Sequence, residues 1–213
     1  MKLYKLTGPA PDYFTRNNTR WGENVTHSGT GAGDLCGPGW IHAYTHPLLA
    51  AFLNPIHGAM ANAVLWEGEG EINLSDHGLK VGCQSFTTLR IIDSPHPTPV
   101  NRTAFGILCA REVYKEPEWL LWAERWLSGE DRTAMAKRIA EKAEWAAECA
   151  TNWTAEKTAE SAACAAYAAA FAEKVAECAA YAASAAESAA ESAAECATKF
   201  ELIAIARQAM DVK

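Results

Sequence analysis

Two hydrophobic periods divide the chain, one typical of strands and one typical of helices. Up to about residue 97, short runs of alternating apolar and polar residues lie between Gly, Pro and Asn residues. These runs predict strands at 2–7, 40–44, 63–72, 79–83 and 85–92. Thr45 is a suitable N-cap for a short helix over 48–53, which should end before Pro55 because a residue that precedes proline is disfavoured in the helical region.

Beyond residue 97 the apolar positions recur at helical spacing. The pattern predicts a helix over 102–114 and another from Pro117, whose apolar stripe comprises Trp119, Trp122, Trp126 and Leu127. We interpret the tryptophan stripe as core that joins the two halves of the chain, with a peptide-binding groove as the alternative. The fold class is therefore α+β, with a β-rich ligand-binding-like domain at 1–97, linking helices at 98–128 and an Ala-rich helical region at 129–213.

Residues 131–213 contain 32 alanines, no glycine and no proline. Alanine loses no side-chain entropy in a helix, so this stretch should be helical throughout, with a break near Thr151 and a new N-cap at Thr154. Two arrangements remain open: one long helix that self-associates, or a stack of shorter helices. Because a lone helix would expose Tyr167 and Phe171, we expect helices that pack on each other, within or between chains, and that mediate assembly into a homo-oligomer.

Charge and composition narrow the functional classes. The chain has 19 Lys and Arg against 26 Asp and Glu, a net charge of −7, so we expect neither nucleic-acid binding nor a polybasic membrane contact. No stretch reads as a signal peptide or a membrane span. Four of the seven cysteines (Cys149, Cys164, Cys178 and Cys196) lie on the helical pattern, which favours reduced thiols and a cytoplasmic location. No spacing of Cys or His predicts a metal site.

The stretch at 33–55 holds the densest set of chemically special residues. A Gly-Pro turn leads into a strand on which His42 and Tyr44 are two residues apart and therefore share a face, suited to contact a base or a ribose. The candidate ligand-binding residues are Lys5, Trp21, Trp40, His42 and Tyr44. The alternative is a half-buried strand whose polar groups find partners locally.

Three glutamates alternate along a later predicted strand. Glu67, Glu69 and Glu71 share one face, and their mutual repulsion could raise a carboxyl pKa and supply a general acid or base. If the chain is an enzyme, Glu69 and Glu71 are the catalytic candidates; the alternative is a solvated strand face.

Other single residues receive simpler interpretations. His27, His57 and His77 are expected to be surface histidines. Cys36, just before a turn, is expected to be structural, with a reactive thiol as the alternative.

Four segments resemble a domain family of phages and prophages that has no assigned activity. They are LYKLT at 3–7, LCGPGWIHAYTHPLLAAFL at 35–53, LWEGEGEI at 65–72 and GLKVGCQSFTTLRII at 78–92. The resemblance covers roughly residues 1–115, and family members often carry low-complexity repeats after the domain, as this chain does.

A more distant likeness is to ADP-ribosyltransferase-type folds, in which a glutamate on a late strand acts on the ribose of NAD. By position, Tyr4, Lys5, His42, Tyr44 and either Glu69 or Glu71 would correspond. Lys5-Leu6-Thr7 stands where such folds carry an H-G-T or R-S-E signature, which favours ligand binding over catalysis.

These resemblances lead to three functional hypotheses. The first is a non-enzymatic phage or prophage accessory protein without a cofactor. Its N-terminal domain would bind a small nucleotide-like ligand or a host protein, in a counter-defence role, and its Ala-rich helices would assemble several copies. The second is an NAD-dependent ADP-ribosyltransferase-like enzyme, and the third is a structural interaction module.

Overall fold

The computed structural model describes residues 1–132, 135–172, 174–195 and 200–213, so Cys196 lies outside the described residues. The α+β prediction is confirmed: antiparallel sheets occupy the N-terminal part and an all-α region follows. The chain forms two compact units, Met1–His96 and Pro97–Lys213. The expected linking helices at 98–128 belong to the second unit.

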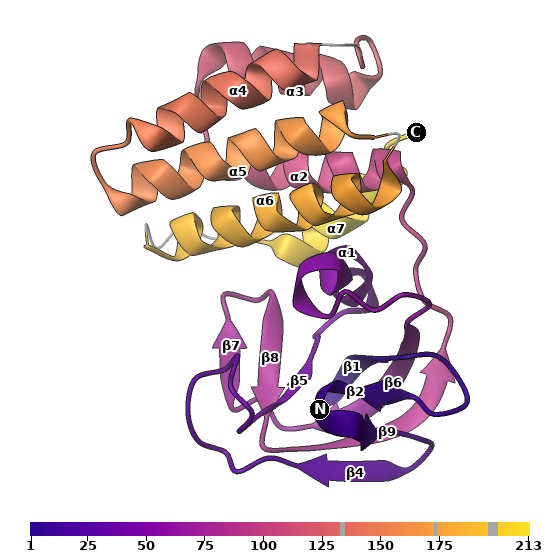
Figure 1. Ribbon diagram of the computed structural model, residues 1–213. Helices are drawn as coiled ribbons and strands as arrows, with labels where there is room; N and C mark the ends of the chain where they lie inside the picture. Colours follow the sequence, from indigo (N-terminus) through magenta and orange to yellow (C-terminus); the bar gives the residue numbers. More distant parts are fainter. Residues whose placement is uncertain (133–134, 173, 196–199) are drawn as a thin grey trace. The chain divides into compact units, whose positions relative to one another are not determined.

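The first unit contains two small antiparallel sheets (Figure 1). The four-stranded sheet has the order β1-β6-β9-β4, with bounds Lys2–Thr7, Val64–Gly70, Ser85–Ile92 and Val25–Ser28. The three-stranded sheet has the order β5-β8-β7, with bounds Ile41–Ala43, Lys80–Cys83 and Leu74–Asp76. β2 (Phe14–Thr15) and β3 (Thr19–Arg20) pair as a short antiparallel hairpin, and the 3₁₀ turn Arg16–Asn18 connects them.

Two features join the sheets of the first unit. Tyr4 of β1 exchanges backbone hydrogen bonds with Tyr44, just after β5. Gln84 is the single residue between β8 and β9, so one nearly continuous segment contributes to both sheets. The strands predicted at 2–7, 40–44, 79–83 and 85–92 are confirmed to within a residue, whereas β7 was not predicted. The strand predicted at 63–72 ends at Gly70, so Glu71 does not lie on the strand that carries Glu67 and Glu69.

One hydrophobic cluster of the first unit has as its buried members Leu3, Trp21, Ala43, Val81, Cys83 and Phe86. Phe86 explains the alternating glycines of β6. A Cβ at Gly68 would lie 2.5 Å from Cζ of Phe86 and 2.3 Å from the carbonyl oxygen of Thr87, and one at Gly70 would lie 3.1 Å from Cδ2 of Phe86. The two glycines therefore make room for the Phe86 ring, not for a ligand.

Helix α1 (Pro47–His57) corrects the prediction for this segment. Its N-cap is His46, whose Nδ1 accepts from the Leu48 N–H, and not Thr45. The helix also continues through Pro55. Proline has no N–H, so the last turn lacks the one intrahelical bond that residue 55 would otherwise donate. The carbonyl oxygen of Asn54 accepts from the N–H groups of Gly58 and Ala59, which fixes the end of the helix.

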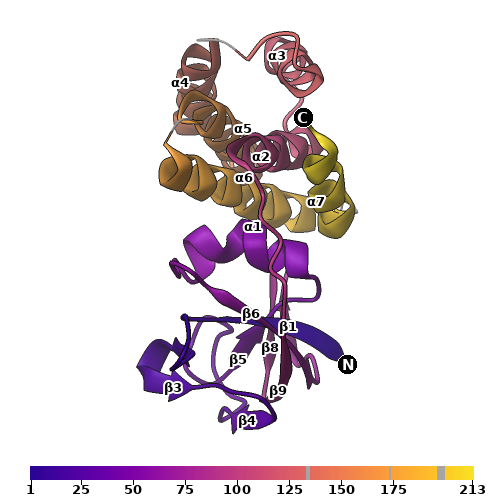
Figure 2. The same cartoon turned by 90° about the vertical axis from the view of Figure 1, so that its right-hand side faces the viewer.

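The second unit is a helical bundle, seen from two sides in Figures 1 and 2. Helix α2 packs against α5, α6 and α7, while α4 packs on α5. The bounds of α2 to α7 are Pro99–Val113, Pro117–Ser128, Met135–Glu148, Trp153–Ala170, Val175–Glu195 and Leu202–Asp211. At Gly106 of α2, an added Cβ would lie 3.2 Å from Cα of Ala182 and 3.5 Å from Cα of Ala165, so the glycine allows α2 to approach both neighbours closely.

The Ala-rich region is a stack of shorter helices within one chain. The break predicted near Thr151 is present, but the new N-cap is Asn152 and not Thr154. The Asn152 backbone is extended, and its side-chain oxygen accepts from the Ala155 N–H at 2.9 Å. Thr154 already lies inside the helix. A further break follows Ala170, where the cluster of Tyr167, Phe171 and Tyr181 rings stacks at the α5–α6 turn.

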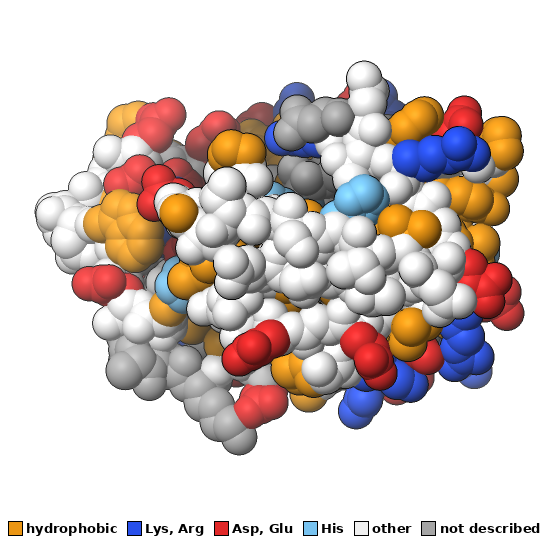
Figure 3. All heavy atoms as spheres, turned by 90° about the horizontal axis from the view of Figure 1, so that it is seen from below, with side chains coloured by type: hydrophobic (Ala, Val, Ile, Leu, Met, Phe, Trp, Pro, Cys, Tyr) orange, Lys and Arg blue, Asp and Glu red, His pale blue; other side chains and the backbone are white. Residues whose placement is uncertain are grey.

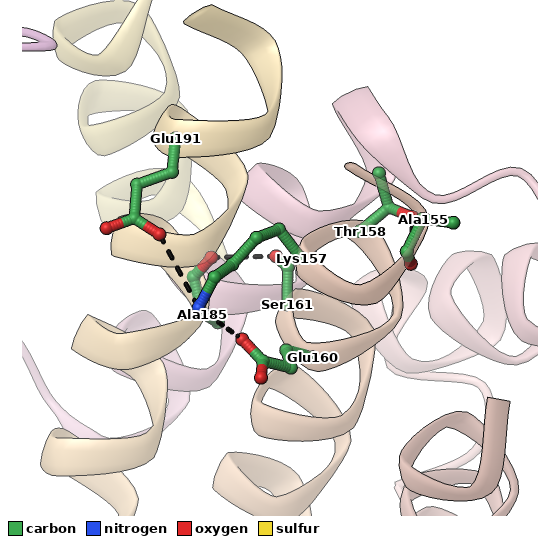
Figure 4. Close-up of polar contacts among 7 residues, drawn as sticks. All are labelled: Ala155, Lys157, Thr158, Glu160, Ser161, Ala185 and Glu191. Carbon is green, nitrogen blue, oxygen red and sulfur yellow. Dashed lines mark hydrogen bonds and ion pairs between the residues drawn. The ribbon is translucent and has the colours of Figure 1, made fainter. Parts of the chain in front are cut away.

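Polar contacts hold the alanine surfaces in register. Figure 4 shows Lys157 of α5 between Glu160, at 2.8 Å, and Glu191 of α6, at 3.7 Å. In the same view the buried Ser161 hydroxyl donates to the carbonyl oxygen of Ala185 at 2.7 Å. The Trp119 indole N–H donates to the carbonyl oxygen of Ala162, which places the predicted tryptophan stripe in the core of the second unit.

Candidate functional site

Three of the predicted ligand-binding residues meet inside the first unit. The Lys5 ammonium donates to the carbonyl oxygen of His42 at 2.9 Å and lies 4.7 Å from the ring centroid of Trp21, a cation–π contact. Lys5 and Trp21 are both buried. These contacts engage the Lys5 ammonium and the Trp21 ring within the fold.

Burial controls the protonation of this cluster. It lowers the pKa of Lys5 to about 8, because the charged ammonium loses its water, and the nearby Cys83 thiol acts in the opposite direction. The pKa of His42 is also lowered, mainly by burial and further by the positive charges of Lys5 and Lys80. The His42 ring is held by a hydrogen bond from Nε2 to the carbonyl oxygen of Leu35.

Tyr44 pairs with a histidine that the sequence analysis assigned to the surface. The Tyr44 hydroxyl and His57 Nδ1 are 3.3 Å apart, and the two rings stack with centroids 6.0 Å apart. Burial lowers the pKa of His57 to about 4 and raises that of Tyr44. The surface prediction for His57 is therefore wrong. The predicted helix ended before Pro55, whereas α1 continues to His57 and brings this residue against Tyr44.

Trp40 is held in a different place. Its indole N–H donates to the carbonyl oxygen of Gly33 at 2.9 Å, and its side chain packs over Gly82 of β8. His27 and His77 were also predicted to lie at the surface. His77 is exposed in the β7–β8 turn, whereas His27 is partly buried and lies edge-on to Trp21, with ring centroids 4.6 Å apart.

The three glutamates do not behave alike. Glu67 is 12% exposed and forms ion pairs with Lys2 at 3.0 Å and Arg90 at 3.1 Å. The hydrogen bond from Lys2, with smaller effects of Arg90, lowers the pKa of Glu67. Mutual repulsion was expected to raise a glutamate pKa, and for Glu67 this is wrong because cations on the neighbouring strands neutralise it.

Glu69 and Glu71 instead line an open groove with a volume of about 490 Å³. The other lining residues are Met1, Ser28, Gly70, Asn73, Gln84, Ser85 and Thr87. Both glutamates are exposed, and within the described part of the chain neither carboxylate has a hydrogen bond or an ion pair. None of the five predicted ligand-binding residues lines this groove.

The groove walls are polar and ordered. The Ser28 hydroxyl donates to the Ser85 hydroxyl at 3.1 Å, and the Asn73 side-chain oxygen accepts from the Gln84 N–H at 2.7 Å. These residues come from the end of β4, from the position before β7 and from the β8–β9 junction. The sequence analysis found the glutamates but missed Gln84 and Ser85, because the one-residue junction between two strands carries no turn signal.

The molecular surface in Figure 3 shows uncharged polar side chains and backbone over most of one face, with charged side chains mainly toward its margin. Within the described residues, no group of three or more His, Cys, Asp and Glu side chains could hold a metal ion. No helix among these residues is long and apolar enough to cross a membrane.

Comparison of the chain with protein-family models, with curated proteins and with solved structures finds no match.

Proposed function

We propose that the first unit is a non-enzymatic binding module and that the groove beside Glu69 and Glu71 is its binding surface. The observation that carries this proposal is the contrast among the three glutamates. Glu67 is neutralised by Lys2 and Arg90, whereas Glu69 and Glu71 keep two unpaired carboxylates at the groove. Because the two carboxylates are exposed and carry no partner among the described residues, they stay available to a cationic ligand.

The charge of the groove selects the ligand. Its walls offer carboxylates, hydroxyls and amides, and the described lining residues include no Lys or Arg. The Met1 ammonium, which also lies at the groove, already donates to the carbonyl oxygen of Gly70 at 2.8 Å, and two glutamate carboxylates outnumber this single positive charge. Phosphate groups bind through Arg, Lys and helix N-termini, so a groove of this kind disfavours them. A ligand with ammonium or guanidinium groups, either a small polyamine or a basic segment of a host protein, complements it.

A nucleotide-like ligand and a counter-defence role in a phage or prophage remain predictions from the resemblance. The enzyme hypothesis is the second candidate, because the two catalytic candidates, Glu69 and Glu71, line the same groove. The unpaired carboxylates would then act on the ribose of NAD, and the pyrophosphate would have to lie away from them. A structural interaction module is the third hypothesis.

Thermal unfolding of the full chain with spermidine, ADP-ribose and NAD separates these hypotheses. A ligand at about 100 times its Kd stabilises the native state by about 2.7 kcal/mol, which raises the melting temperature measurably. We expect spermidine to raise it and Glu69→Gln with Glu71→Gln to abolish the rise. Glu23→Gln, which removes one exposed carboxylate outside the groove, should preserve it. A rise with NAD together with release of nicotinamide would favour the enzyme, and no response to any ligand would favour the structural module.

Assembly through the Ala-rich helices needs a different surface from the one first expected. The alanine faces of α5 and α6 are buried within the chain, so they are not free to bind a second copy. Among the described residues of the second unit, Trp145, Leu121 and Trp153 are 66%, 50% and 47% exposed, and self-association could use these large apolar side chains.

A further inference from the structure

A lysine and a cysteine meet in the first unit, away from the groove. The Lys80 ammonium donates to the sulfur of Cys36 at 3.2 Å. Lys80 is also ion-paired with Asp76, with 3.4 Å between Nζ and Oδ2. Lys80 is 9% exposed, whereas Cys36 is exposed, so a reagent in solvent can reach the sulfur while the amine stays fixed behind it.

The loop that carries Cys36 is fastened on both sides of it. The Gly37 N–H donates to the carbonyl oxygen of Asp34 at 2.8 Å, which closes a tight turn around Cys36. The carbonyl oxygen of Leu35 is bonded by the His42 ring. The Leu35 side chain covers Gly82 of β8, where an added Cβ would lie 2.5 Å from its Cδ1.

The lysine is equally well placed by its strand pairing. Lys80 is the first residue of β8 and lies opposite Asp76 of β7 across a three-residue turn. This pairing directs the ammonium to the space between the Asp76 carboxylate and the Cys36 sulfur. The nucleophilic pair is thus brought together by two segments that are 44 residues apart in the chain.

We propose that Cys36 and Lys80 form a peroxide-sensitive modification site, in which oxidation of the thiol leads to a covalent sulfur–nitrogen bond between the two side chains. An ammonium within hydrogen-bond distance stabilises the negative charge of a thiolate, the form of cysteine that reacts. The same amine is then in position to attack the oxidised sulfur, in the way that a sulfenic acid condenses with a neighbouring nitrogen.

The chemistry balances with hydrogen peroxide as the oxidant. The Cys36 thiol first gives its proton to water. The thiolate attacks one peroxide oxygen, a sulfur–oxygen bond forms and the oxygen–oxygen bond breaks; the sulfur is oxidised to sulfenic acid and the peroxide is reduced. The departing hydroxide takes a proton from the Lys80 ammonium and leaves as water.

The Lys80 amine, now neutral, supplies the electron pair for the second step. Its nitrogen attacks the sulfur, the sulfur–oxygen bond breaks, and the departing hydroxide takes the proton that the nitrogen loses. The product is a sulfenamide, and relative to the thiol and the neutral amine the protein has lost two hydrogen atoms. The cross-link would fasten the loop over 33–40 to β8.

Peptide mapping of the full chain after treatment with hydrogen peroxide tests this proposal. We expect a cross-linked peptide that joins Cys36 to Lys80, lighter by two hydrogens than the two peptides together, and no cleavage by trypsin after Lys80. Lys80→Arg keeps the positive charge and the partner for Asp76 but offers no amine. It should abolish the cross-link and let the sulfenic acid at Cys36 accumulate, where a cyclic diketone can trap it.

Cys149, an exposed thiol of the second unit, is an internal reference in every sample. We expect Cys36 to be oxidised faster than Cys149 in the wild-type chain, because the Lys80 ammonium lies 3.2 Å from the Cys36 sulfur, and Lys80→Met to remove most of this difference. The proposal is overturned if Cys36 accumulates as sulfenic acid in the wild-type chain without the cross-link. It is equally overturned if Lys80→Arg still forms a cross-link at Cys36, or if Cys36 and Cys149 react at equal rates.

Discussion

Lys5 places an ammonium in the interior of the first unit, where it is bonded to the carbonyl oxygen of His42 and lies over the ring of Trp21. The residue alternation of β1 directs Lys5 inward between the buried Leu3 and Thr7, because it occupies the same face. A buried amine of this kind fixes the position of β5 relative to β1, and it costs the native state the desolvation of a charge.

The cost of this charge should appear as a pH dependence of stability. The pKa of Lys5 falls from 10.5 to about 8 on folding, so the unfolded chain holds the proton to a higher pH than the native chain. Unfolding therefore takes up a proton between these values, and the free energy of unfolding rises with pH through that window, by up to about 3 kcal/mol. Tyr44, whose pKa is raised above 10.0, acts in the opposite direction at higher pH.

Urea unfolding of the wild-type chain and of Lys5→Met between about pH 8 and 10 measures this effect. We expect the midpoint of the wild-type chain to rise relative to that of Lys5→Met as the pH increases, because methionine keeps the volume without the charge. Burial raises the pKa of the Cys83, Cys109, Cys164 and Cys178 thiols above 9.0, so these groups lower the midpoints of both proteins alike at the upper end of the window. Equal slopes for the two proteins would show that Lys5 keeps its ordinary pKa in the folded state.

At the scale of elements, single turns decide where the helices begin and end. Alanine content alone makes 131–213 helical, and the break near residue 152 was visible in the sequence. The capping residue was not, because Asn152 and Thr154 are both good caps and only the backbone geometry distinguishes them. The prediction of α1 ended the helix too early, because a proline disfavours the helical conformation of the residue before it without excluding it.

The capping contact yields a paired test. Asn152→Ala should lower the free energy of unfolding by about 1 kcal/mol, since it removes the bond to the Ala155 N–H. Thr154→Ala should change it by only a few tenths of a kcal/mol, because alanine suits the helix interior as well as threonine does or better. Thermal unfolding followed by circular dichroism compares the two variants, and a larger loss for Thr154→Ala would contradict the observed cap.

Close packing of α2 on α5 and α6 depends on Gly106. A Cβ there would lie 3.2 Å from the backbone of Ala182, so Gly106→Val should destabilise the bundle by about 2 kcal/mol or more through overpacking. Ala204→Val, at an exposed position of α7, provides the matched control for the helical cost of valine. Comparable melting temperatures for the two variants would show that α2 can move away from its neighbours at little cost.

At the scale of the whole molecule, the sequence predicted the α+β class, most strands of the first unit and the helical nature of the rest. The candidate site was predicted only in part. Glu69 and Glu71 were identified by their alternation, but their separation from Lys5, His42 and Tyr44 depends on which face of each sheet is buried. Lys5 and Trp21 were predicted to bind a ligand but are buried in the first unit. Aromatic rings and hydrogen-bonded polar groups occur in a small protein core as well as in a ligand site, so the sequence does not distinguish the two.

The central claim is that binding takes place at the groove beside Glu69 and Glu71 and not at the interior cluster around Lys5. Backbone amide spectra of the isotope-labelled full chain, recorded during titration with spermidine, test this claim most directly. The account predicts shifts at Gly70, Gln84 and Ser85 that saturate, that persist in Glu23→Gln, and that vanish in the variant with both Glu69→Gln and Glu71→Gln. Shifts that centre on Lys5, His42 and Tyr44, or groove shifts that are unchanged in the double variant, would contradict it.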